Sequence, residues 1–399
     1  MICLTRLLAK QLRAAIRRTL QLQHSTLPHI VWVEGTALGL RVWSQNQHGA
    51  VEYRRAGTFP AERLPISVAV LAACEGTKAT DTIELERQAS GQVVVRWQDR
   101  GVPQSLTVES SETDCEPVPS SPTDWSDNSP GLVTALADAM EITDTSSSRW
   151  ALSSIQLRGS GGRIAATDST QMLVQNGFEF PWSEDVLVPR TTVFRQRDLW
   201  CDQRLRVGRT PEHVAFQSGP WTVWLAVHKD GRFPVVENII PDAGSASTRM
   251  HIAEEDVDFL VNTVPRLPCD DSSHKPLTVD LNGHVALLAR AADTSPVTRA
   301  VLSNGQRDGD ELRWHTNRDY LLRAVQLGFR EIELFGNEAP AVCRDAHRVY
   351  VWSLLPAADA LVAGDNPLSW RRRCVLTRPR KQHPSSAQLR LRSFGQPRP

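Results

Sequence analysis

Residues 188–193, with the sequence Val-Pro-Arg-Thr-Thr-Val, decide the predicted fold, because similar stretches recur at equal distances on both sides. Residues 59–64 read Phe-Pro-Ala-Glu-Arg-Leu, and residues 316–321 read Thr-Asn-Arg-Asp-Tyr-Leu. The two prolines are 129 residues apart, and the asparagine follows the second proline by 128 residues. A Pro or Asn turn of this kind predicts a short helix followed by a strand. The repeated interval indicates three copies of one structural unit.

A second pattern recurs about 125 residues apart, namely apolar residues at helical spacing. It predicts helices that carry three apolar stripes: Leu7, Leu8, Leu12, Ile16 and Leu20; Leu132, Val133, Leu136 and Met140; and Val257, Leu260, Val261 and Val264. Short alternating runs at residues 92–97, 222–227 and 348–352 predict strands. Each unit therefore combines two helices with antiparallel sheet, and the chain is predicted to be an α+β protein of three tandem domains.

Linker composition places the domain boundaries. Residues 109–130 hold six acidic residues, four prolines and no basic residue, so they form an acidic Pro/Ser linker. We predict domains at residues 1–130, 131–247 and 248–365, followed by a basic disordered tail at residues 366–399. That tail holds nine basic residues and no acidic one, although Lys+Arg and Asp+Glu both number 45 in the whole chain. It is either an arm for phosphate or another acidic surface, or simply a solvated segment.

Composition indicates an ordinary globular protein, with 41% hydrophobic and 23% charged residues among 399. No run approaches the roughly 18 apolar residues of a membrane helix, and charges interrupt the N-terminus too early for a signal peptide. We therefore expect a cytoplasmic protein that does not contact membranes. Seven cysteines without C-x-x-C spacing are expected to be reduced, structural thiols.

Enzyme signatures are missing from the sequence. Residues 159–162 are Gly-rich but lack the Lys of a phosphate loop, so they are predicted to form a hairpin turn. Asp168 has no second carboxylate or His at a catalytic spacing, which favours a turn-capping role. No zinc-protease or nucleophile-elbow motif occurs. The chain is predicted to have no catalytic residues, no metal and no cofactor.

Several motifs, in this order, resemble those of the bacterial sliding clamp, the β subunit of DNA polymerase III. The most distinctive is Asp-Gly-Arg-Phe-Pro at residues 230–234, closing with Ile-Ile-Pro at 239–241. Residues 149–152 and 164–168 are similar to the family's R-x-x-L and A-T-D segments, and residues 188–190 to the entry of its second helix in that domain. Residues 317–321 and 350–356 are similar to its N-x-x-Y-L helix start and terminal strand. The resemblance spans roughly residues 1–358.

The resemblance implies three clamp-type domains that form half of a dimeric ring, with helices around a central hole and sheets outside. Such a homodimer encircles duplex DNA without reading its sequence, has no active site, and is placed on DNA by a clamp loader. It tethers a DNA polymerase or repair proteins, which insert a short Q-L-x-L-F peptide into a slot between the second and third domains. The implied function is that of a processivity factor.

Transferred position by position, the family's peptide slot is expected at Arg149, Leu152, Thr167, Met172, Pro234, Asn238, Ile239, Asn317, Tyr320, Ser353, Leu354, Leu355 and Pro356. Two departures change the rim. The family's G-H-R is replaced by Ser-Thr-Gln at residues 169–171, and its basic position before Ile239 is Asn238. These replacements remove positive charge and an imidazole.

Basic residues are expected to contact DNA from the first helix, from the second helix of the second domain and from the tail: Arg13, Arg17, Arg18, Arg190, Arg195, Arg197, Arg371, Arg372 and Arg373. Glu254, Glu255, Asp256 and Asp258 oppose them if they face the hole, although acidic residues at a helix start also stabilise its dipole. The alternative is a clamp-fold paralogue that does not encircle DNA and acts as an adaptor through its slot or tail. A third hypothesis is that the chain is an enzyme of unknown type.

Overall fold

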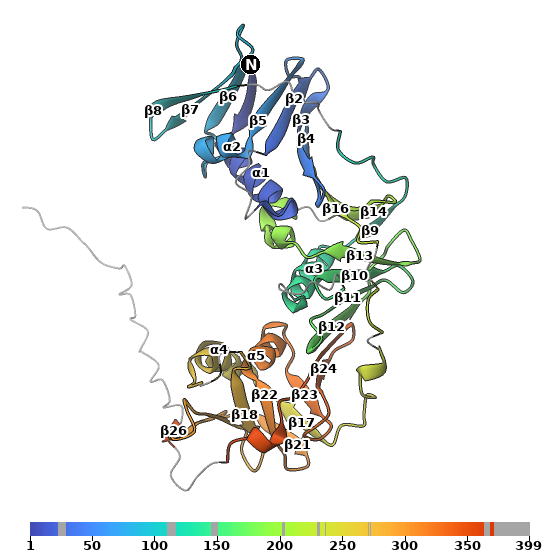
Figure 1. Ribbon diagram of the computed structural model, residues 1–399, viewed down its shortest axis with the longest axis vertical. Coiled ribbons are helices and arrows are strands. Elements are labelled where there is room, and N and C mark those ends of the chain that lie inside the picture. The colour runs from blue at the N-terminus through green and yellow to red at the C-terminus, as the bar shows by residue number, and fades with distance from the viewer. Residues whose placement is uncertain are drawn as a thin grey trace, which may run out of the picture.

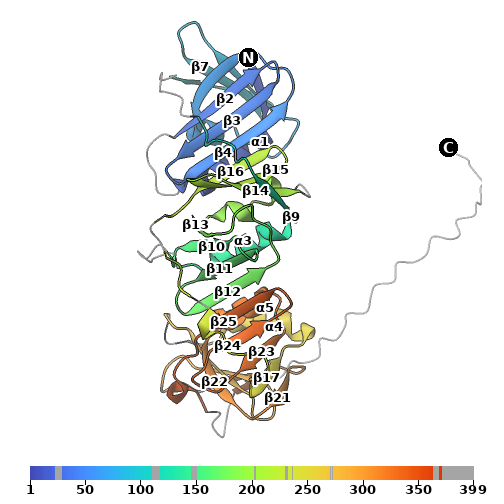
Figure 2. The same ribbon diagram turned by 90° about the vertical axis from the view of Figure 1, so that its right-hand side faces the viewer.

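The chain forms a crescent of three similar units (Figure 1). The computed structural model describes residues 1–22, 29–109, 117–144, 151–201, 204–229, 232–235, 237–269, 271, 273–362 and 368–370. Helices lie on the concave side of the crescent, and sheets run along the convex side, as the turned view in Figure 2 shows. The α+β fold of three tandem units that the sequence predicts is confirmed.

The first unit packs two helices between two sheets. Its first helix begins where Thr5 accepts a 3.1 Å hydrogen bond from the backbone N–H of Leu8, which caps the helix. Leu8, Leu12 and Ile16 lie on its buried face, as the apolar stripe predicts. The elements are β1 (Ile2–Thr5), α1 (Arg6–Thr19), β2 (Ile30–Thr36), β3 (Gly39–Asn46), β4 (Gly49–Ala56), β5 (Glu62–Ser67), α2 (Val68–Cys74), β6 (Thr82–Arg87), β7 (Val93–Asp99) and β8 (Val102–Val108).

The second unit repeats this order, but two 3-10 turns replace its second helix. The elements are β9 (Trp125–Asn128), α3 (Gly131–Ile142), β10 (Ser154–Arg158), β11 (Arg163–Thr167), β12 (Gln171–Asn176), β13 (Asp185–Pro189), η2 (Thr192–Arg195), η3 (Arg197–Leu199), β14 (Leu205–Arg209), β15 (His213–Ser218) and β16 (Trp221–Ala226). Gln196 separates the turns with φ −85° and ψ 85°, while its side chain donates to the carbonyl of Gln11 on α1. The short helix predicted after Pro189 is present as these two 3-10 turns rather than as one continuous helix, and Gln196 makes its contact with α1 at the break between them.

The third unit again follows the same order and adds one strand and the end of the chain. Its elements are η4 (Glu237–Ile239) in the preceding connection, then β17 (Thr248–His251), α4 (Glu254–Thr263), η5 (Val264–Arg266), β18 (Pro276–Asp280), β19 (Ala286–Ala289), β20 (Thr298–Val301), β21 (Gln306–Gly309), β22 (Arg313–Asn317), α5 (Arg318–Gln326), β23 (Glu331–Leu334), β24 (Ala341–Arg344), β25 (Arg348–Trp352), η6 (Ala357–Asp359) and β26 (Leu368–Trp370).

One of the three stretches that define the sequence period was misplaced. Residues 59–64 were expected to form a short helix before a strand, but residues 62–67 form strand β5, and the helix follows at Val68. Pro60 precedes the strand, whereas Pro189 and Asn317 end the equivalent strands β13 and β22. The helix starts at Val68, Thr192 and Arg318 give the actual spacing of the units. A proline can lie at either end of a strand, so its position alone does not locate the helix.

Antiparallel strand pairing joins the units into continuous sheets. Residues 49–53 of β4 pair with residues 221–225 of β16, which makes one sheet of eight strands, β5-β2-β3-β4-β16-β15-β14-β9. Residues 171–175 of β12 pair with residues 348–352 of β25, which makes one sheet of nine strands, β13-β10-β11-β12-β25-β24-β23-β17-β21. The two remaining described sheets, β1-β6-β7-β8 and β22-β18-β19-β20-β26, lie at the tips of the crescent.

Strand pairing also bears on the proposed domain limits. Strand β9 pairs with β14 of the second unit, so we propose that this unit starts at β9 rather than at residue 131. At the other end, Leu368–Trp370 form β26 and pair in parallel with β20. These three residues depart from the disorder predicted for the tail, and residues 371–399 lie outside the described part of the chain.

The cysteines within the described residues are free thiols, namely Cys3, Cys74, Cys201, Cys269 and Cys343. Burial raises the pKa of Cys74 to about 12, which makes it an inert core residue. Among the described residues there is no helix of the length and apolar character that a membrane crossing requires.

Gly49 is a point on which the first unit boundary depends. A Cβ at this position would lie 2.0 Å from the carbonyl oxygen of Trp224 on the partner strand, and the φ of Gly49 is +155°. We expect Gly49→Ala to lower the free energy of unfolding by more than about 2 kcal/mol, because β4 must move away from β16. Gly91→Ala is the matched control, since Gly91 has φ +86° but open space around it, and its cost is about 1 kcal/mol. Equal losses in chemical denaturation would contradict this account.

Candidate functional site

The junction between the second and third units brings several predicted slot residues together. Met172 on β12 pairs with Val351 on β25, and the backbone N–H of Ser353, just beyond β25, donates to the carbonyl of Thr170 at 2.8 Å. Thr167 ends β11 and is buried. Residues far apart in sequence therefore meet here because β12 and β25 are neighbouring strands.

A tight turn at residues 167–171 forms one wall of this junction. The carboxylate of Asp168 accepts hydrogen bonds from the backbone N–H groups of Thr170 and Gln171, both at 2.8 Å, and from the Thr170 hydroxyl at 2.7 Å. Thr167 donates its hydroxyl to the carbonyl of Gln171 at 2.8 Å. The turn-capping role predicted for Asp168 is confirmed, and its acceptor sites are occupied by its own turn.

Ser169 lies in this turn with a φ of +83°. The left-handed region is unfavourable for residues with a Cβ and is normally taken by glycine, which is the residue of the clamp motif at this place. The loop therefore keeps the backbone shape of a glycine turn with a serine in it. Such strain persists only where surrounding contacts enforce it, and here the Asp168 and Thr167 hydrogen bonds do so.

Two hydroxyl groups join the units at the rim of the predicted slot. The side chain of Asn317 caps α5 by accepting from the backbone N–H of Asp319 at 2.9 Å, which orients the first turn of the helix. Tyr320 in that turn places its hydroxyl 2.6 Å from the hydroxyl of Thr170. Burial raises the pKa of Tyr320, with a smaller contribution from the nearby carboxylates. The rim at this point is a neutral, hydrogen-bonded pair.

An apolar cluster underlies the junction. Met172 packs with Phe233, and the half-buried Ile240 packs against the same cluster, which also contains Ala165, Val174, Leu187, Val342 and Val351. The preceding segment is exposed, since Ile239 has 59% and Val235 has 69% of its surface accessible. Pro234 and Asn238 are exposed as well. This arrangement leaves apolar side chains open to solvent beside a buried apolar floor.

Other predicted slot residues do not belong to the apolar cluster around Met172. Leu152 and Leu354 are half-buried. Leu355 and Pro356 line a cleft of about 680 Å³ in the third unit together with His315 and Asp359. The backbone N–H of Leu355 donates to the carbonyl of His315 at 2.9 Å. Arg149 lies outside the described residues, as do Asp230 and Gly231 of the motif at 230–234.

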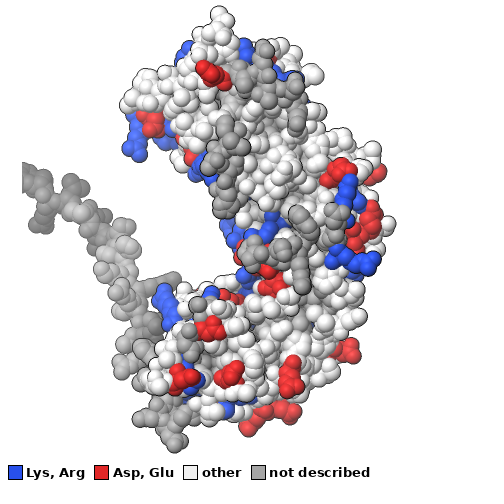
Figure 3. All heavy atoms as spheres, in the orientation of Figure 1, with Lys and Arg blue, Asp and Glu red and all other residues white. Residues whose placement is uncertain are grey.

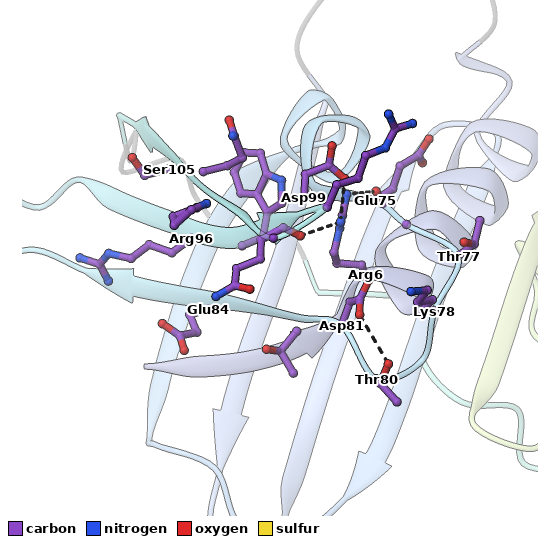
Figure 4. A pocket seen from close by; sticks show the side chains of 18 residues that line it. Arg6, Glu75, Thr77, Lys78, Thr80, Asp81, Glu84, Arg96, Asp99 and Ser105 are labelled. Carbon is purple, nitrogen blue, oxygen red and sulfur yellow. Dashed lines mark hydrogen bonds and ion pairs between the residues drawn. The ribbon is translucent and has the colours of Figure 1, made fainter. Parts of the chain in front are cut away.

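A larger cleft of about 1140 Å³ lies at the free tip of the first unit (Figure 4). Arg6 forms part of its wall and is largely buried. The guanidinium donates to the carbonyls of Cys74, Glu75 and Gln98 and to the carboxylate of Asp99 at 3.0 Å. These bonds tie the start of α1 to the end of α2 and to β7, so Arg6 is used for structure rather than for a ligand.

The predicted DNA-binding arginines differ in their exposure and in whether an acidic side chain pairs with them. Arg13 makes a two-bond ion pair with Glu75 at 2.5 and 2.8 Å, and Arg195 pairs with Glu141 at 2.6 Å. Arg17 and Arg197 are exposed and have no acidic partner within 4.0 Å among the residues described. Arg18 and Arg190 are half-buried, and Arg371, Arg372 and Arg373 lie outside the described residues. Basic and acidic side chains adjoin one another along the inner edge in Figure 3.

The acidic start of α4 is partly neutralised. Glu254 accepts from Arg330 at 2.7 Å, and Asp256 is buried, where it accepts from the backbone N–H of Asn304 at 3.1 Å. Asp258 is exposed. The run of carboxylates therefore serves in part to fasten α4 to neighbouring segments, a role that the sequence did not predict.

Comparison of the fold with solved structures gives a consistent answer, although no protein-family model and no curated protein sequence matches the chain. The DNA polymerase III subunit β of Pseudomonas aeruginosa matches with a TM-score of 0.71 at 17% identity, over 89% of this chain and 99% of that one. The β subunit of Thermotoga maritima gives 0.73 at 12% identity, over 89% and 98%. The β subunit of Streptococcus pyogenes gives 0.72 at 13% identity, over 89% and 99%.

The chain has the fold of a bacterial sliding clamp. Within this clamp fold, the junction assembles Thr167, Met172, Tyr320 and Ser353 as the motifs predict. Thr170 was noted only as part of a replaced motif, yet it makes the hydroxyl contact that joins the units. Its position two residues after the A-T-D motif is the signal that could have identified it.

Ser169 provides a test of the strained turn. We expect Ser169→Gly to raise the free energy of unfolding by about 0.5–1 kcal/mol. Relief of the left-handed strain in the folded state exceeds the cost of the extra conformational entropy that a glycine gives to the unfolded chain. Ser303→Gly is the matched control, since Ser303 is also exposed but has no positive φ, and it should destabilise the clamp fold. Thermal denaturation of both variants measures the difference. Destabilisation by both substitutions would show that Ser169 is not strained.

Proposed function

We propose that this chain is a processivity clamp, two copies of which close around duplex DNA and tether a polymerase or repair protein. The observation that carries the proposal is the crescent, with helices on the concave side and sheet edges at both tips. Both boundaries inside the crescent are antiparallel pairs of edge strands, β4 with β16 and β12 with β25. A third boundary of the same kind, made twice between two copies, would close a ring of six units with twofold symmetry.

The DNA contact is proposed to be electrostatic and independent of sequence. Arg17 and Arg197 are exposed and have no acidic partner within 4.0 Å in the described part of the chain, so their guanidinium groups can approach phosphates without first breaking an ion pair there. Arg13 and Arg195 must exchange a carboxylate for phosphate, so they add less. A weakly charged lining of this kind holds duplex by enclosure more than by affinity, and it permits sliding.

Partners are proposed to bind by a short peptide at the junction of the second and third units. The exposed Ile239 and the buried cluster around Met172 can receive apolar anchors of such a peptide. The chain itself would be non-catalytic and cytoplasmic, and a separate ATP-dependent clamp loader would open the ring. Replacement of the family's charged rim residues by Thr170, Gln171 and Asn238 favours a neutral peptide over an acidic one.

Retention on circular DNA tests encirclement. Protein loaded by its clamp loader on nicked circular duplex should remain bound through a high-salt wash, and linearisation of the circle should release at least about tenfold more of it, because a ring slides off free ends. Gel filtration of the protein–DNA mixture before and after restriction measures the retained fraction. Equal retention on circle and linear duplex would contradict encirclement.

A second candidate function is that of an adaptor that does not encircle DNA. The specific observation in its favour is the pairing of Arg13 with Glu75 and of Arg195 with Glu141, which lowers the positive charge on the concave face. Such a protein would use the junction slot or its basic tail to recruit partners. It would bind circular and linear DNA alike.

Substitutions at two exposed residues of the same segment, Ile239 and Val235, test whether the slot binds a peptide. We expect Ile239→Asp to weaken binding of a fluorescent peptide with the sequence Gln-Leu-Ser-Leu-Phe by about 10- to 100-fold, because an apolar contact worth about 1.5–3 kcal/mol is lost. Val235→Asp is the matched control, since Val235 is also exposed and is not a predicted slot residue. Fluorescence anisotropy gives both dissociation constants. Equal weakening, or none, would place the peptide elsewhere.

A further inference from the structure

Strand β20, at the tip of the third unit, corresponds to the strands that join the units elsewhere in the chain. Strands β4, β12 and β20 are equivalent, because each is the last strand of a meander that follows the first helix of its unit. In the first two units this strand pairs with the final strand of the next unit, β16 or β25. The equivalent final strand of the first unit is β8, at the opposite tip of the crescent. In the proposed ring, the edge of β20 would therefore pair with β8 of a second copy.

That edge is covered by the chain itself. Residues 298–300 of β20 pair with residues 368–370 of β26, in parallel. The two internal boundaries are antiparallel and each contains five residue pairs, whereas this contact contains three. Parallel pairs are slightly less stable per residue than antiparallel ones. The covering strand is thus a short and weaker version of the pairing that joins the units.

We propose that β26 and β8 of a second copy compete for the same edge of β20, so that the C-terminal segment holds the crescent open. The proposal rests on the proposed ring closure and adds its regulation. A strand edge offers one row of N–H and C=O groups, so only one of the two strands can occupy it. Closure then requires release of residues 368–370, and the equilibrium between open crescent and closed ring depends on this exchange as well as on protein concentration.

Ser369 is the position at which the competition can be tested in the full chain. Proline there removes the backbone N–H at the centre of a three-residue strand and disfavours pairing with Arg299. Ser386→Pro is the matched control, because it places the same substitution in the tail outside β26. Sedimentation velocity over a range of concentrations gives the dimer dissociation constant of the three proteins. Hydrogen exchange of residues 298–301 at low concentration shows directly whether β20 is covered.

We expect Ser369→Pro to tighten dimerisation at least about tenfold and to speed exchange of the β20 amides in the monomer, with Ser386→Pro unchanged. Equal dimerisation of all three proteins would overturn the competition and leave the ring intact. Weaker dimerisation of Ser369→Pro would also overturn it, because β26 would then belong to the interface. Monomers throughout, Ser369→Pro included, would overturn both ring closure and the competition that rests on it.

Discussion

Antiparallel pairing of edge strands between units is the interaction on which the rest of this structure depends. Each unit alone has sheets with unpaired edges, and an unpaired row of peptide groups is both unstable and prone to association. Pairing of β4 with β16 and of β12 with β25 satisfies four of these edges and fixes the curvature of the chain. The helices then lie on one side, and the junction residues lie at the second boundary, because of this pairing.

Sequence patterns predicted the units because the patterns are local. The apolar stripe of α1 and the helix start after Asn317 depend on residues three or four positions apart, and both were located correctly. Residues 59–64 were misplaced because a proline marks either end of a strand. The short helix predicted after Pro189 is divided into two 3-10 turns at Gln196, and the sequence could not show this division, because the contact of Gln196 with α1 bridges 185 residues and leaves no local signal.

The candidate site divides in the same way. Motif positions predicted Thr167, Met172 and Tyr320 near one another, because the order of motifs carries the topology. The motifs could not predict that Thr170 and Tyr320 bond to each other, or that Arg13 is paired with Glu75 and Arg195 with Glu141. Those contacts depend on the direction of long side chains. A count of arginines in a sequence therefore overstates the positive potential of the concave face.

The two tips of the crescent protect their open edges in different ways, and the difference has a physical consequence. Strand β8 contains Pro103, which lacks a backbone N–H and so weakens non-specific pairing of other strands with that edge. Strand β20 has no proline and is covered by β26 instead. The missing N–H of a proline is a fixed feature of β8, whereas the pairing of β26 with β20 is proposed to be reversible. In the proposed ring, association of two crescents would therefore be limited at one tip by the proline in β8 and at the other by release of β26.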